Sequence, residues 1–141
     1  MVIVDANVLL YAANSRARHH RAARRWLEEA LNGDEPVGFA WVVLLAFIRI
    51  TTLPAAMERP LSAAEAFGLV DAWLAAGPAV VVSPTSRHAA LLRGFLLAAG
   101  TGGNLTSDAH LATLAVEHGA RCCTFDRDFE RFDGLQTIVP V

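Results

Sequence analysis

The chain has 141 residues, of which 54% are hydrophobic and 18% are charged, and its net charge is −2. This length suits a single domain over residues 1–141, and a composition more apolar and less charged than that of ordinary domains excludes intrinsic disorder. All 12 basic residues are arginines, which excludes reactions that need a catalytic lysine, such as Schiff-base chemistry, Walker A phosphate binding and receiver-type phosphorylation.

In chain order, hydrophobic periodicity and turn residues predict twelve elements. These are a strand at 2–4, a helical turn at 8–13 capped by Asn7, a helix from Asn14 or Ser15 to Gly33, a strand at 37–40, a helix at 41–53, a helix from Ser62 to Gly77, a strand at 79–82, a helix at 87–99, a helix capped by Thr106 or Ser107 that reaches His118, a strand at 121–125, a helical turn at 127–132 and a strand at 137–141.

Short buried strands therefore alternate with helices. The run at 2–4 is continuously apolar, as expected of a strand covered on both faces. Ser62 and Glu65 form a capping-box pattern, which fixes the start of one helix. This alternation predicts an α/β domain with a mostly parallel central sheet of about five strands.

The two cysteines, Cys122 and Cys123, are adjacent in the sequence. That spacing suits neither a disulfide framework nor a zinc site, so we expect two small core residues on opposite faces of a strand. No signal peptide is recognisable, and no apolar stretch is long enough to span a bilayer. A cytoplasmic protein without membrane contact is expected, and the apolar surplus favours a self-association or partner surface.

Three aspartates stand where such a sheet places its chemistry. Asp5 follows the first strand, Asp126 follows the fourth, and Asp108 lies in the first turn of the helix that opens at Thr106. Ligand sites of open α/β sheets gather at the carboxyl ends of the strands. Converging carboxylates repel one another unless a cation neutralises them, and an all-oxygen cluster suits Mg²⁺ or Mn²⁺.

A purely structural interpretation of these aspartates is equally open at this point. Asp5 and Asp126 are each suited to cap the helix or turn that follows, and Asp108 is favoured near a helix N-terminus. Their joint placement at one sheet edge favours the metal site.

Three motifs stand in order along nearly the whole chain: IVDANVLLY from Ile3, NLTSDAHLA from Asn104 and GARCCTFDRDFERF from Gly119. Together they resemble PIN-domain ribonucleases, and most closely the VapC-type toxins of bacterial toxin–antitoxin pairs. The resemblance implies a three-layer α/β/α fold and Mg²⁺-dependent hydrolysis of RNA, with Mn²⁺ as a substitute. It also implies a homodimer and inhibition by a small VapB-like antitoxin.

The resemblance assigns roles to particular residues. Asp5, Asp108 and Asp126 match the metal-binding, catalytic aspartates of the family, and Asn7 and Thr124 match polar residues that orient them. Asp128 is a candidate substitute ligand or supporting residue, and a capping or surface role is the alternative.

One position departs from the family pattern. The family commonly has a glutamate three residues before an arginine in the helix after the second strand. Arg49 fits that arginine, but the earlier position is Ala46. The fourth carboxylate is therefore absent, which leaves open whether one or two metal ions bind.

Residues 16–25 contain five arginines and two histidines. One interpretation is a solvated helix face. The other is a contact with RNA phosphates through Arg21, Arg24 and Arg25, which a protein of net negative charge needs locally. His20 and His110 are expected to be structural, because His110 lies two residues after Asp108 and points to another side of the helix.

Two alternative functions remain open. Ala46 favours a catalytically weak PIN fold that binds RNA or a protein, and the same carboxylate chemistry suits a structure-specific DNA nuclease. The apolar helix at 41–53 is expected to be mostly core, with part of its surface, beside that of the helix from Ser62, forming a dimer or antitoxin face.

Overall fold

The computed structural model describes all 141 residues, and its centre is a five-stranded parallel sheet. The strands are β1 (Val2–Val4), β2 (Val37–Phe39), β3 (Ala79–Val81), β4 (Arg121–Cys123) and β5 (Thr137–Ile138). Their order is β3-β2-β1-β4-β5. The chain builds outward from β1 on one side and then crosses to β4 on the other, so the topological switch point lies between β1 and β4. The parallel α/β prediction is confirmed.

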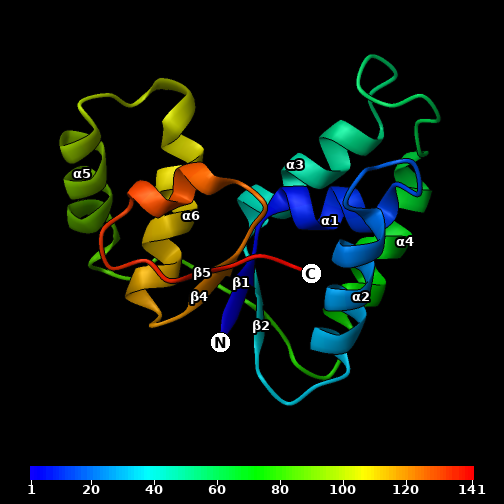
Figure 1. The fold of residues 1–141 in the computed structure, drawn as a ribbon, viewed down its shortest axis with the longest axis horizontal. Coiled ribbons are helices and arrows are strands. Elements are labelled where there is room, and N and C mark those ends of the chain that lie inside the picture. Colours follow the sequence, from blue (N-terminus) through cyan, green and yellow to red (C-terminus); the bar gives the residue numbers. More distant parts are fainter.

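Six α-helices cover the two faces of this sheet. They are α1 (Ala6–Ala13), α2 (His20–Leu31), α3 (Trp41–Thr51), α4 (Ala63–Leu74), α5 (His88–Ala99) and α6 (Thr106–Glu117), with short 3₁₀ turns η1 (Gly103–Leu105) and η2 (Arg127–Arg131). Figure 1 shows α5 and α6 on one side of the sheet and α1 to α4 on the other. This is the expected three-layer α/β/α architecture. None of the helices combines the length and the apolar character needed to cross a membrane.

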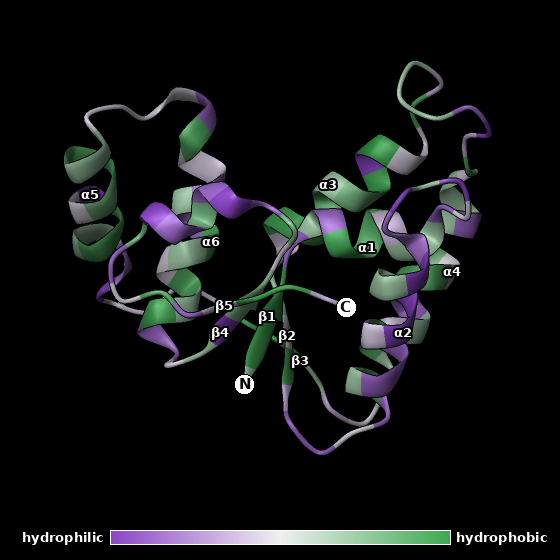
Figure 2. Cartoon of the chain, in the orientation of Figure 1, coloured by the Kyte–Doolittle hydropathy of each residue, from purple (hydrophilic) through white to green (hydrophobic).

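The core lies between these layers and is continuous through the sheet. Ile3, Val4 and Phe39 are fully buried, and so are both cysteines, which are free thiols as expected. Gly38 allows β1 and β2 to approach closely, because a Cβ at this position would lie 2.8 Å from Ile3 Cγ1. Figure 2 shows the hydrophobic strands at the centre and the more polar surface of α2.

Helix starts are where the structure differs most from the sequence prediction. The second helix begins at His20 rather than at Asn14 or Ser15, because Asn14 Oδ1 accepts a hydrogen bond of 3.1 Å from the Arg16 backbone N–H and holds a turn there. The first helix begins at Ala6 and is capped by Asp5, not by Asn7.

Other boundaries shift by smaller amounts. Helix α6 has no side-chain cap at its start, so the predicted cap at Thr106 or Ser107 is wrong. The last strand ends at Ile138 rather than at residue 141, and Pro140 there has no N–H with which to extend a ladder.

Candidate active site

Asp5 lies at the switch point of the sheet, at the carboxyl end of β1. Val4 is in register with Cys123, so the chain leaves β1 and β4 side by side. One carboxylate oxygen of Asp5, Oδ1, accepts a hydrogen bond of 2.7 Å from the Ala6 backbone N–H. The other, Oδ2, accepts bonds of 2.7 Å from Thr124 Oγ1 and 3.0 Å from Asn7 Nδ2. Asp5 therefore caps α1 with one oxygen and contacts the end of β4 with the other.

Asn7 and Thr124 hold the Asp5 carboxylate in one orientation. Besides contacting Asp5, Asn7 Nδ2 donates to Thr124 Oγ1 at 3.1 Å, and Asn7 Oδ1 accepts from the Phe125 backbone N–H at 3.2 Å. Thr124 Oγ1 also accepts a bond of 3.0 Å from the Asp126 backbone N–H. Each polar atom of the two side chains thus has a defined partner, which locks their rotamers.

Asp108 faces the same cleft as Asp5. This cleft of about 560 Å³ lies between α3 and α6, and its lining includes Asp5, Ala46, Arg49, Ser107 and Asp108. Asp108 comes from the first turn of α6, where the helix dipole favours a carboxylate. The cleft therefore brings together two of the three predicted catalytic aspartates.

Burial and neighbouring carboxylates raise the pKa values of Asp108 and Asp5. Partial burial, followed by the negative charges of Asp5, Asp126 and Asp128, raises the pKa of Asp108 from its ordinary value of 3.8 to about 6. Burial also raises the pKa of Asp5, against the lowering effect of its hydrogen bonds, and the charge of Asp126 adds to the rise. Unneutralised negative charge therefore accumulates at the carboxyl edge of β1 and β4.

Asp126 and Asp128 lie beside the cleft rather than in its lining. Asp126 Oδ1 accepts a hydrogen bond of 2.9 Å from the Asp128 backbone N–H, so Asp126 caps η2. Asp128 is exposed. Asp126 and Asp128 both add to the electrostatic repulsion at Asp108. The prediction that Asp5 and Asp126 cap the elements after them is confirmed, and a functional role of the same carboxylates is compatible with it.

The donor set has the right chemistry for a hard divalent cation, but its side chains do not yet converge. Asp5, Asp108 and Asp126 offer only oxygen ligands, as Mg²⁺ and Mn²⁺ prefer, and their mutual repulsion is what a cation would relieve. As oriented, no group of three or more acidic, histidine or cysteine side chains surrounds a single point. Ala46 lines the cleft. The position at which the family commonly has a fourth carboxylate therefore faces the cleft, and here it carries only a methyl group.

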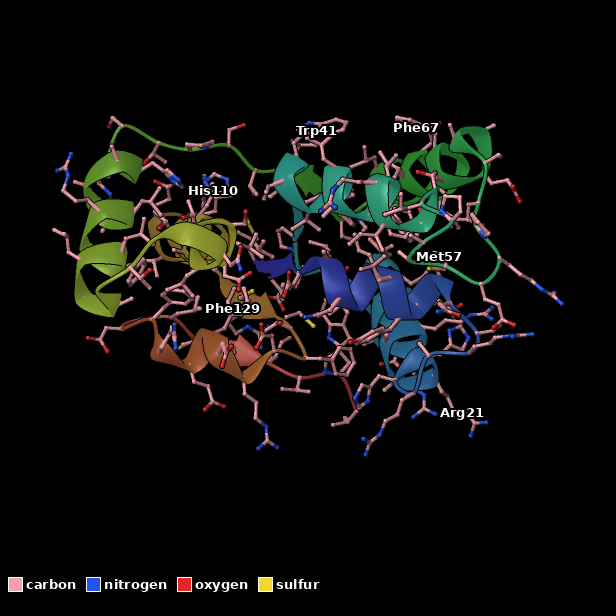
Figure 3. The ribbon with its side chains drawn as sticks, turned by 90° about the horizontal axis from the view of Figure 1, so that it is seen from above. Arg21, Trp41, Met57, Phe67, His110 and Phe129 are labelled. Carbon is pink, nitrogen blue, oxygen red and sulfur yellow. The ribbon has the colours of Figure 1, made fainter.

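The three predicted RNA-binding arginines differ in their surroundings. All three are exposed on α2. Arg24 Nε forms an ion pair of 2.7 Å with Glu28 Oε1 one turn later, whereas Arg21 and Arg25 form none. Figure 3 shows Arg21 projecting outward from the start of α2. Two of the three cations are therefore free to contact a polyanion.

The histidines of α5 and α6 form a structural network apart from the aspartates. His88 Nδ1 lies 2.7 Å from the buried Glu117 Oε1, and His88 Nε2 lies 2.8 Å from His110 Nδ1. The structural interpretation of His110 holds, since this network joins α5 to α6. His88 and Glu117 give no recognisable signal in the sequence, because their partners lie on different helices.

Fold and site together define a parallel α/β domain with a carboxylate-rich cleft at its switch point. The model of the PIN-domain family matches residues 2–135. The chain therefore belongs to the PIN-domain family, and within it to the VapC type.

Named relatives support this placement, and solved structures share the fold. The chain is 54% identical to Ribonuclease VapC37 of Mycobacterium tuberculosis, over 99% of this chain and 97% of that protein. It is 40% identical to Ribonuclease VapC43 of the same species, over 100% of this chain and 96% of that protein. The fold matches VapBC2 from Rickettsia felis bound to a promoter DNA fragment, with a TM-score of 0.70, 18% identity and 100% coverage of both chains. It also matches Mycobacterium tuberculosis VapC20, a sarcin-ricin loop cleaving toxin, with a TM-score of 0.68 and 16% identity over 92% of this chain and 93% of that one.

Proposed function

We propose that this protein is a Mg²⁺-dependent endoribonuclease, the toxin of a type II toxin–antitoxin pair, which hydrolyses RNA phosphodiester bonds with water. The carrying observation is the cleft in which Asp5 and Asp108 meet, with the pKa of Asp108 raised to about 6 by burial and by three neighbouring carboxylates. The ribonuclease names of relatives up to 54% identical support RNA as the substrate.

In this proposal Asp5 and Asp108 would hold the cation, and Asp126 would assist them. When bound, Mg²⁺ supplies a Lewis acid that lowers the pKa of water and screens charge on the phosphate. Asn7 and Thr124 keep the Asp5 carboxylate in one orientation through the hydrogen bonds to Oδ2. Asp128 adds negative charge near Asp108 from the exposed start of η2.

Arg49 gives the cleft its only cation. It lines the cleft with Asp5, Asp108 and the apolar side chains of α3. A guanidinium there suits a phosphate oxygen of the substrate, and so would orient the RNA backbone against the aspartates without serving as a base.

A second candidate function is a PIN fold that binds RNA or a protein without efficient cleavage. The observation in its favour is Ala46, which presents a methyl group to the cleft where the family commonly has a carboxylate. Structure-specific cleavage of DNA in place of RNA is the third possibility, and competition between single-stranded RNA and DNA substrates separates it from the first.

We further propose that the protein acts in the cytoplasm as a homodimer held inactive by a VapB-like antitoxin. Solved VapBC complexes share this fold, which supports such a partner. Exposed apolar side chains on α3, including Trp41 at 48% and Leu45 at 59% exposure, and Phe67 on α4 support burial against another chain. Figure 3 shows Trp41 and Phe67 on the outer rim of these helices.

The test is cleavage of a mixed RNA pool by the purified protein with Mg²⁺, with Mn²⁺ and with EDTA, beside Asp108→Asn. Metal-dependent cutting that disappears in the variant supports the nuclease. Binding of the pool without cutting under either metal supports the binding module, and preferential cutting of a DNA pool supports the DNA nuclease.

A further inference from the structure

Three aromatic rings form a cluster at the edge of the candidate active site. Tyr11 comes from α1, His19 from the turn before α2, and Phe125 from the segment after β4. His19 and Phe125 are stacked, with centroids 4.7 Å apart and planes 16° apart. Tyr11 lies 5.7 Å from His19 and 5.3 Å from Phe125. Segments that are distant in the sequence thus present one aromatic surface.

This aromatic cluster is tied to the carboxylates by the backbone. Phe125 stands between Thr124 and Asp126, and its N–H donates to Asn7 Oδ1 at 3.2 Å. On the other side, His20 Nδ1 lies 2.8 Å from the carbonyl oxygen of Tyr11, which fixes the start of α2 against α1. The position of the rings relative to Asp5 is therefore set by hydrogen bonds.

A pocket of about 470 Å³ opens beside two of these rings. Tyr11 and His19 line it together with apolar side chains that include Ile50 and Met57. Figure 3 shows Met57 at the far end of α1, at the same end of the molecule as Arg21. The volume of this pocket and its mixture of aromatic and apolar walls suit a flat heterocycle.

The charge around this pocket is positive. Arg18 lines it and forms no ion pair. Glu58, the acidic residue next to Met57, is engaged by Arg16. A ligand that combines an aromatic ring with a phosphate therefore matches both features of the pocket.

We propose that the aromatic cluster and this pocket bind one unstacked nucleobase of a single-stranded RNA that runs along α1 from the aspartates at its start. The proposal rests on the ribonuclease function above. Aromatic side chains beside a cationic groove are a general means of holding single strands, because every base has a π-face. A base inside a duplex is already stacked and cannot enter, so the site selects single-stranded substrates.

The proposal is tested by replacing His19, whose side chain is exposed. Binding is measured in EDTA by fluorescence anisotropy, with two probes of equal length: a short oligoadenylate and an abasic ribose-phosphate oligomer. The wild type is expected to prefer oligoadenylate by about tenfold, the size of one stacking contact. His19→Ala should lose this preference while binding the abasic oligomer unchanged, and His19→Phe should retain it.

The proposal is overturned if His19→Ala prefers oligoadenylate as strongly as the wild type does. It is also overturned if His19→Phe loses the preference as His19→Ala does, because an aromatic ring at this position would then not be what holds the base. Cleavage by the same proteins in Mg²⁺ separates this result from the function. If the wild type cuts RNA and His19→Ala cuts it equally, the nuclease stands and the base pocket falls. If the wild type neither binds nor cuts RNA, both fall.

Discussion

Thr124 Oγ1 donates a 2.7 Å hydrogen bond to Asp5 Oδ2, although 119 residues separate the two in sequence. The same hydroxyl oxygen accepts from Asn7 Nδ2 and from the Asp126 backbone N–H. Thr124 is almost fully buried, so no water replaces these partners. One hydroxyl group therefore joins the segment after β1 to the segment after β4 at the candidate active site.

Replacing that hydroxyl should lower both stability and activity. Thr124→Val removes one of the two donors to Asp5 Oδ2 and leaves the Asp126 backbone N–H without its acceptor, which costs about 1–3 kcal/mol of unfolding free energy. Loss of the orienting bond should also reduce RNA cleavage by about 10–100-fold. Urea denaturation and initial cleavage rates measure the two effects. Thr124→Ser keeps the hydroxyl and serves as the control; a valine variant as active as the serine variant would contradict the orienting role.

Asp108→Asn should stabilise the metal-free protein at neutral pH. The folded pKa of Asp108, about 6, lies above its ordinary 3.8, so the folded state favours the protonated form. The resulting stability is complete below the ordinary pKa and is lost as pH rises through 6. With allowance for its partial exposure, removing the charge should add about 1 kcal/mol at pH 7.

Thermal unfolding in EDTA between pH 4 and pH 8 tests this expectation. The difference between Asp108→Asn and wild type should vanish at the acid end and grow through pH 6. Added Mg²⁺ should stabilise the wild type and not the variant. Asp71→Asn on the exposed surface of α4 is the matched control, and an identical gain there would trace the effect to net charge alone.

Ala46→Glu should strengthen metal binding, because it adds a carboxylate to the cleft that contains Asp5 and Asp108. The Mn²⁺ concentration that gives half of the thermal stabilisation should fall by about tenfold, the usual effect of one added partner at a metal site. The metal-free variant should be less stable than wild type, since a further negative charge faces Asp108. The control is Ala46→Gln, because a glutamine side chain is nearly as large as that of glutamate but carries no charge. Equal Mn²⁺ affinity in the two variants would exclude a carboxylate ligand at this position.

Neutralising the arginines of α2 should flatten the salt dependence of RNA binding. Removing one arginine–phosphate interaction lowers the slope of log K against log salt by about 0.7 for a single strand. Arg21→Gln and Arg25→Gln should each show this change, and Arg24→Gln less, because Arg24 is paired with Glu28. Arg93→Gln on α5, another exposed arginine without an ion pair, controls for net charge. Unchanged slopes would support the interpretation that these arginines form a solvated helix face without contact to RNA.

Local patterns were sufficient to predict the strands and the position of each aspartate. The buried run before Asp5 locates β1 because continuous apolar sequence is what a doubly covered strand requires. The strand predicted at 121–125 is also present as β4, although it ends at Cys123. The capping box at Ser62 and Glu65 forms as predicted, with bonds of 3.1 and 3.0 Å. These features depend on neighbours in the sequence.

What the sequence did not reveal depends on long-range packing. Ala46 lines the same cleft as Asp108 because of how α3 and α6 flank the sheet. No local pattern in the sequence encodes the separation of these two helices. The late start of α2 is an exception, since it depends on a local hydrogen bond from the Arg16 backbone N–H to Asn14 Oδ1 that competes with helix formation. The aromatic cluster joins Tyr11, His19 and Phe125 from three elements, and its rings carry no shared spacing.

The pairing of β1 with β4 has a consequence for synthesis of the protein. Asp5 is translated 119 residues before Thr124. A nascent chain on the ribosome therefore carries one carboxylate of the site before the residue that orients it exists. On the proposed function, a protein that cuts RNA would remain harmless to its own message until β4 and Asp126 have been made.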